Sequence, residues 1–75
     1  MPRGTRFDHE RLRAAVKEAG INATQLAAAA GVHAHTADNH MAGKTVPRAS
    51  DLAAYASRLG RRVEDFFVPE QARTV

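Results

Sequence analysis

The sequence has no cysteine and no tryptophan among its 75 residues, and aromatic residues make up only 5% of it. Without cysteine, neither disulfides nor thiolate metal sites can stabilise the chain. No apolar run approaches the roughly 20 residues that a membrane-spanning helix needs. The charged N-terminus is not followed by the apolar segment of a signal peptide. We therefore expect one small cytoplasmic domain with a modest hydrophobic core and no membrane contact.

The chain also lacks a strong charge of either sign. Eleven Lys and Arg residues stand against eight Asp and Glu residues, which gives a net charge of +3 at pH 7. An excess of this size is weak evidence for a nucleic-acid partner when taken alone. The arrangement of particular residues is therefore more informative about function than the net charge.

The spacing of apolar residues predicts helices along almost the whole chain. Each predicted helix ends close to a glycine or a proline, as helices commonly do. No sustained alternation of polar and apolar residues indicates a strand. The sequence predicts an all-α, compact five-helix bundle over residues 7–68, preceded by a flexible basic arm (1–6) and followed by a tail (69–75). The five helices are expected at about 8–19, 23–30, 33–41, 49–59 and 63–67.

The most informative segment runs from Gly20 to Pro47 and contains two short helices joined by a tight turn at Gly31. Four alanines end the first of these helices, and such small residues let another helix approach closely. The second helix begins with polar side chains, namely His33, His35, Thr36 and Asn39. Core packing explains such a helix poorly, so we expect it to contact a polar partner.

The residues of this segment and its flanks match those of a known family. From Leu12 to Phe66 the chain resembles the phage Cro/repressor type of helix-turn-helix, also called the xenobiotic-response-element family. The resemblance implies a lambda-repressor-like fold and a DNA-binding transcriptional regulator, most often a repressor, which acts as a homodimer on double-stranded DNA. The landmarks are Gly20-Ile21, Leu26-Ala27, Gly31-Val32, Thr36, Gly43-Lys44, Pro47, Leu52, Ala56 and Leu59-Gly60.

The resemblance also assigns roles to individual residues, because the second helix of such a motif enters the major groove. Asn39 can pair with adenine, and His35 can donate to guanine. The residues expected to face base edges are Ala34, His35, Thr36, Asp38 and Asn39. Those expected to contact the DNA backbone are Arg6, Asn22, Thr24, His33, Lys44, Thr45 and Arg48.

Some residues depart from the family pattern. Ala23 stands where a phosphate-binding glutamine is typical, and His40 stands where the family has an aliphatic residue. A buried, neutral His40 needs a hydrogen-bond partner. The predicted reading helix also contains no Lys or Arg and carries Asp38. These features keep an alternative open, in which the same fold serves as a protein-interaction module or an antitoxin-type partner-binding protein.

Two aromatic residues near the C-terminus suggest how a dimer could form. If Phe66 or Phe67 stays exposed beside Val63 or Val68, it forms an apolar patch suited to self-association. Alternatively, both rings pack under the first helix. A dimer would read two half-sites about 34 Å apart on one face of the DNA.

Metal binding and catalysis have little support. On a helix, His33 and His35 point about 200° apart, and His33 and His40 lie about 10 Å apart along the axis. Neither spacing matches the i, i+4 pair of helical zinc sites. No nucleophile or phosphate-binding glycine loop accompanies the histidines. We therefore expect no metal, no cofactor, no small-molecule ligand and no enzymatic activity.

Overall fold

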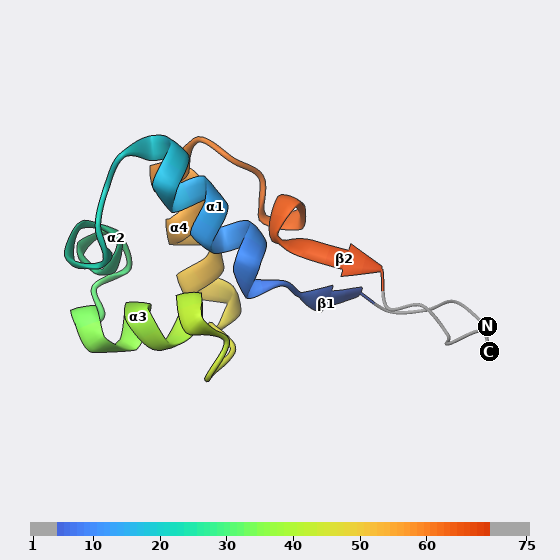
Figure 1. Cartoon of the computed structure of the whole chain (residues 1–75), viewed down its shortest axis with the longest axis horizontal. Helices are drawn as coiled ribbons and strands as arrows, with labels where there is room; N and C mark the ends of the chain where they lie inside the picture. The colour runs from blue at the N-terminus through green and yellow to red at the C-terminus, as the bar shows by residue number, and fades with distance from the viewer. Residues whose placement is uncertain (1–4, 70–75) are drawn as a thin grey trace.

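The computed structural model describes residues 5–69 and shows a small helical body from which a short two-stranded ribbon extends (Figure 1). Four α-helices form the body, and a single turn of 3-10 helix leads into the second strand. In chain order the elements are β1 (Thr5–Phe7), α1 (His9–Ala19), α2 (Ala23–Ala30), α3 (Ala34–Ala42), α4 (Ala49–Leu59), η1 (Val63–Phe66) and β2 (Phe67–Pro69).

The helices lie where the sequence places them, but the expected count of five is not matched. The last predicted helix is only the 3-10 turn η1, which ends at Phe66. Phe67 continues in extended backbone, with φ −116° and ψ 146°, so the chain leaves the helical region there. The fold is mostly helical, with four α-helices in place of five.

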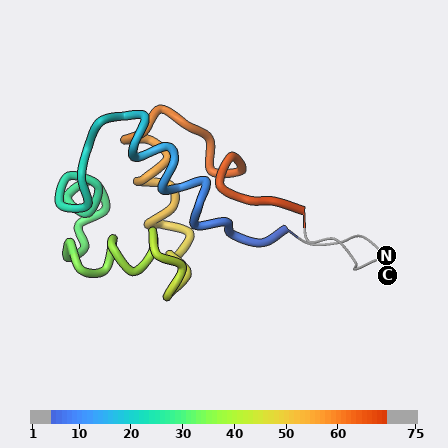
Figure 2. Tube along the Cα trace, in the orientation of Figure 1, coloured from blue at the N-terminus to red at the C-terminus, as the bar shows by residue number. Residues whose placement is uncertain are grey.

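The two strands were not expected from the sequence. β1 and β2 pair antiparallel, with Arg6 opposite Val68 and Phe7 opposite Phe67, so the two ends of the described chain lie side by side (Figure 2). Thr5 and Arg6 therefore lie in a strand, although the sequence places them in a flexible arm. The remainder of that predicted arm (1–4) and most of the predicted tail (70–75) lie outside the described residues.

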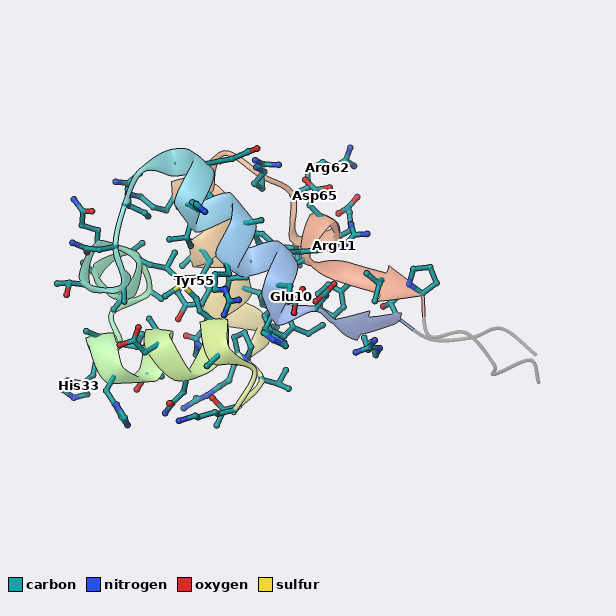
Figure 3. All side chains as sticks on the ribbon, in the orientation of Figure 1. Glu10, Arg11, His33, Tyr55, Arg62 and Asp65 are labelled. Atoms are coloured by element: carbon teal, nitrogen blue, oxygen red, sulfur yellow. The ribbon has the colours of Figure 1, made fainter. Side chains whose placement is uncertain are left out.

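The core lies where the four helices and η1 meet. Leu12 of α1, Leu26 of α2 and Phe66 of η1 are fully buried, and Tyr55 of α4 fills the centre (Figure 3). Within α3, Ala37 and the polar residue His40 are buried, and Met41 packs against the core while partly buried. α3 therefore contributes little apolar surface to the core, and its residues His35, Asp38 and Ala42 are exposed.

Candidate nucleic-acid interface

The pair α2–α3 is held together by local sequence signals. The Oδ1 atom of Asn22 accepts from the backbone N–H of Gln25 at 2.9 Å, and Oε1 of Gln25 accepts from the N–H of Asn22 at 3.0 Å, which fixes the start of α2. At its end, the N–H of Gly31 bonds back to Ala27 and Ala28. Ala27 is buried, and its small side chain allows α3 to pack close. The two helices form the expected helix-turn-helix.

The outward face of α3 is polar. His35 and Asp38 are exposed and Asn39 is half-buried. The Nδ2 atom of Asn39 lies 3.5 Å from Nε2 of His35, one helical turn away. A hydrogen bond of that length is weak, so both side chains can exchange it for a bond to a partner. The structure thus brings together three of the five residues expected to read bases.

The other two residues of that predicted set lie elsewhere on α3. Ala34 and Thr36 are half-buried. Thr36 lines a groove between the start of α3 and the start of α4. Its position on α3 therefore separates it from the outward face that carries His35.

The start of α3 is open. His33 occupies the N-cap position, makes no capping hydrogen bond through its side chain, and projects from the outer end of the helix (Figure 3). The first backbone N–H groups of a helix have no partner within the helix, and they carry a partial positive charge. An anion next to His33 would therefore accept hydrogen bonds from these N–H groups and be attracted by their partial positive charge.

Most residues expected to contact the DNA backbone lie in or next to the helix-turn-helix, but one lies in the ribbon. Those in or next to the helix-turn-helix are all exposed, but the Asn22 oxygen is engaged in the α2 cap. Lys44 and Thr45 fold back on α3, because the Lys44 N–H bonds to the Asn39 carbonyl at 2.9 Å. Arg6 lies in β1, outside the helix-turn-helix. The exposed set flanking α3 comprises Asn22, Thr24, His33, Lys44, Thr45 and Arg48.

The groove between α3 and α4 has a volume of about 520 Å³. Both helices begin at its rim, so their first turns face the same space. Its mixture of imidazole, hydroxyl, guanidinium and carboxylate groups makes it polar. The groove is lined by Gly31, Val32, His33, Thr36, His40, Val46, Arg48 and Asp51.

His40 closes the inner side of this groove and bonds to the core. Its Nδ1 atom lies 2.8 Å from the hydroxyl of Tyr55. Burial lowers the pKa of His40, although the charge of Asp51 opposes this. Burial and the charge of Asp51 together raise the pKa of Tyr55 to about 12. At neutral pH the imidazole is therefore neutral and the phenol keeps its proton.

Sequence reasoning identified the need of His40 for a partner but not the partner itself. Helical spacing places Tyr55 on a buried face of its helix, but it does not reveal which polar atoms bond there. The place of Asp51 at the groove was missed as well. A usable signal was present, because Tyr55 is the only tyrosine of the chain and its hydroxyl also needs a partner when buried.

The residues expected to mediate dimerisation do not all lie at the surface. Phe66 is only 1% exposed and belongs to the core, so it is not available to a partner. Its ring is buried because η1 turns back over α1. Phe67 and Val68 are half-buried on β2. The Phe67 ring meets Phe7 edge to face, with centroids 6.2 Å apart.

Within residues 5–69 no cluster of three or more His, Cys, Asp or Glu side chains could hold a metal ion. No helix among these residues is both long and apolar enough to cross a membrane.

Comparison with known proteins agrees with the geometry. A family model described as a helix-turn-helix domain matches residues 10–65, a range that begins within α1 and ends within η1. The chain therefore belongs to this helix-turn-helix domain family. No significant match was found among curated proteins or among solved structures. Membership of the family indicates a DNA-binding protein and does not point to an enzyme.

Proposed function

We propose that this protein is a sequence-specific transcriptional regulator of the Cro/repressor type, which represses by occupying double-stranded DNA. The observation that carries the proposal is the polar outward face of α3, with His35, Asp38 and Asn39 side by side. This face follows directly on the turn from α2. In helix-turn-helix proteins the second helix reads the major groove.

In this interpretation, each side chain of the face has a chemical role. The Asn39 amide can both donate to and accept from an adenine edge, and His35 can donate to guanine. Asp38 can accept from the amino group of cytosine. Lys44, at the end of α3, and Arg48, at the start of α4, would contact phosphates on either side.

A homodimer would let so small a reader reach useful affinity, because two half-sites are then bound at once. The ribbon supplies apolar side chains that the helical body does not fully cover. These are Phe67 and Val68 of β2, and Val63 at the start of η1 is also 36% exposed. We assign the dimer contact to these residues in place of the buried Phe66.

A second candidate function is supported by the charge of α3. This helix contains no Lys or Arg, and Asp38 is exposed on it. A protein partner, as for an antitoxin or an interaction module, would fit such a surface as well as DNA does.

Binding of labelled duplex DNA over a series of salt concentrations separates the two functions. A DNA reader should bind random duplex at low salt with a logarithmic salt slope that reflects its phosphate contacts. It should also enrich one sequence from a random pool. Failure to bind any duplex at low salt would contradict the regulator and favour the protein partner.

A further inference from the structure

The groove between α3 and α4 contains a buried side chain with an unused polar atom. His40 is only 4% exposed and lines this groove. Its Nδ1 atom bonds to Tyr55, while no hydrogen bond within residues 5–69 uses its Nε2 atom. In this part of the chain, no completely buried side-chain nitrogen or oxygen lacks a partner. The Nε2 atom therefore keeps contact with solvent, and it does so through the groove.

The bond to Tyr55 decides where the proton of this imidazole lies. Tyr55 is fully buried, and His40 is the only hydrogen-bond partner of its hydroxyl within residues 5–69. If the hydroxyl accepted from Nδ1–H, its own proton would be buried without an acceptor, which is costly. The hydroxyl therefore donates to Nδ1. A neutral imidazole then carries its proton on Nε2, so the atom facing the groove is a donor.

The other groups at the groove are mostly donors as well. Arg48 carries a guanidinium, and Thr36 a hydroxyl. The first N–H groups of α3 have no capping side chain. The one carboxylate at the groove, that of Asp51, accepts from the backbone N–H of Arg48 at 3.4 Å. The Arg48 guanidinium offsets the negative charge of Asp51, and the donors suit a ligand with several acceptor oxygens.

We propose that this groove binds a phosphate group and that the Nε2–H of His40, oriented by Tyr55, donates a hydrogen bond to it. Arg48 supplies the charge. If the phosphate belongs to the DNA backbone, this proposal rests on the proposed function, which is DNA binding. A free phosphate offers the same oxygens, and the experiment separates the two sources.

The tautomer can be measured directly. Long-range ¹H–¹⁵N NMR spectra of the imidazoles should show His40 with its proton on Nε2. Its ring signals should shift when inorganic phosphate or a duplex of random sequence is added. A proton on Nδ1 would overturn the proposal, and so would signals that neither phosphate nor DNA displaces.

Measurements of DNA affinity and of its salt dependence test whether His40 donates to a phosphate or only supports the fold. Removing His40 alone would leave the Tyr55 hydroxyl buried and unpaired. The double variant His40→Leu/Tyr55→Phe removes both partners, a change that can be nearly neutral for folding. It should bind duplex DNA about tenfold more weakly than the wild type, the usual effect of losing a bond to a charged group. Its salt slope should be unchanged, because a neutral donor releases no counterion.

Arg48→Ala is the charged comparison. It should weaken binding and also reduce the salt slope by about one unit. The single variant Tyr55→Phe keeps the ring of His40 but removes the bond that holds its proton on Nε2. We expect this variant to weaken binding less than the double variant does. Wild-type affinity for both duplex DNA and inorganic phosphate in a folded double variant would overturn the proposal.

The two ligands also distinguish this proposal from the function on which it rests. Shifts of the His40 signals with both phosphate and DNA would support a general phosphate site, and shifts with DNA alone would support a backbone contact. Shifts with phosphate in a protein that binds no DNA would keep the groove as a phosphate site and contradict the DNA-binding regulator.

Discussion

The imidazole of His40 and the hydroxyl of Tyr55 meet at 2.8 Å, so a side chain from the proposed reading helix is bonded inside the core. His40 is the buried polar side chain of the described residues. Burying a polar group costs free energy unless a hydrogen bond compensates for it. The hydrogen bond between His40 and Tyr55 therefore joins α3 to α4, and this link depends on the protonation state of both side chains.

Stability should fall as the solution is made mildly acidic. Burial lowers the pKa of His40 in the folded state from its ordinary value of 6.5, so the unfolded state binds more protons. The contribution is fully present above pH 6.5 and is lost as the pH falls from there towards the lowered folded pKa. The slope contributed by His40 can reach about 1.4 kcal/mol per pH unit. Urea unfolding at a series of pH values measures it.

The control for this prediction is His40→Leu/Tyr55→Phe, which keeps His9, His33 and His35 but removes the buried imidazole. Its free energy of unfolding should depend less on pH between neutral and mildly acid solution. The same acid dependence in both proteins would show that His40 is not the group responsible.

At the alkaline end the same pair makes a second prediction. The chain has one tyrosine and no tryptophan, so tyrosinate absorbance reports Tyr55 alone. Because the folded pKa of Tyr55 is raised from 10 to about 12, the folded state holds its proton longer than the unfolded state does. Stability is fully present below pH 10 and is lost as the pH rises from 10 to about 12.

Tyrosinate should therefore appear together with alkaline unfolding, or close to pH 12 where the fold survives. Circular dichroism recorded in parallel identifies which of these happens. Urea-unfolded chain is the reference and should titrate near the ordinary value. Titration near pH 10 in the folded protein would contradict the buried bond to His40.

The sequence specifies some parts of this fold more completely than others. Asn22 and Gly31 cap the two ends of α2, and capping depends only on residues close in sequence. The helix-turn-helix could therefore be predicted from neighbouring residues alone. The pairing of Phe7 with Phe67 could not, because strands of three residues are too short to show alternation. It forms only where the two ends of the domain meet.

The candidate site shows the same division between local and tertiary information. The placement of His35 and Asn39 on one face of α3 follows from helical spacing. The position of Thr36 in a groove and the bond from His40 to Tyr55 depend on how α3 and α4 pack. Helical spacing predicts which face is buried, but it does not predict which polar atoms meet there.

Gly43 should tolerate a side chain less well than the other helix-ending glycines do. It has φ +81°, and a Cβ atom at this position would lie 2.7 Å from Nδ1 of His9. Gly60 has a similar φ of +68°, but a Cβ there meets nothing within 4 Å. Both alanine variants incur the left-handed strain of roughly 1–2 kcal/mol. Gly43→Ala alone adds overpacking, for a further cost of roughly 1–3 kcal/mol.

Chemical unfolding of Gly43→Ala and Gly60→Ala gives this difference directly. Adding His9→Ala to the Gly43 variant should remove most of the extra cost that the substitution has in the presence of the imidazole. Equal destabilisation by the two glycine variants would mean that His9 does not press on the end of α3.

Self-association should depend on Phe67 and not on Phe66. Phe67→Ser changes a half-buried ring of the ribbon, so the helical signal should persist while the sedimentation coefficient shifts from dimer to monomer. Phe66→Ala removes a ring that is only 1% exposed and should cost about 3–5 kcal/mol in folding free energy. A wild-type chain that sediments as a monomer at every concentration would contradict the dimer.

Asn39 on α3 and Lys44 just after this helix should affect DNA binding differently, because one is assigned to bases and the other to a phosphate. Asn39→Ala should cost roughly 1–3 kcal/mol on the sequence selected from a random pool and little on random duplex. Lys44→Ala should weaken binding to both duplexes alike and reduce the salt slope by about one unit. Lys17→Ala removes the same charge from an exposed position on α1, outside the helix-turn-helix, and serves as the matched control. If Lys17→Ala lowers the slope as much as Lys44→Ala does, the effect reflects net charge, and the assignment of Lys44 to the DNA backbone fails.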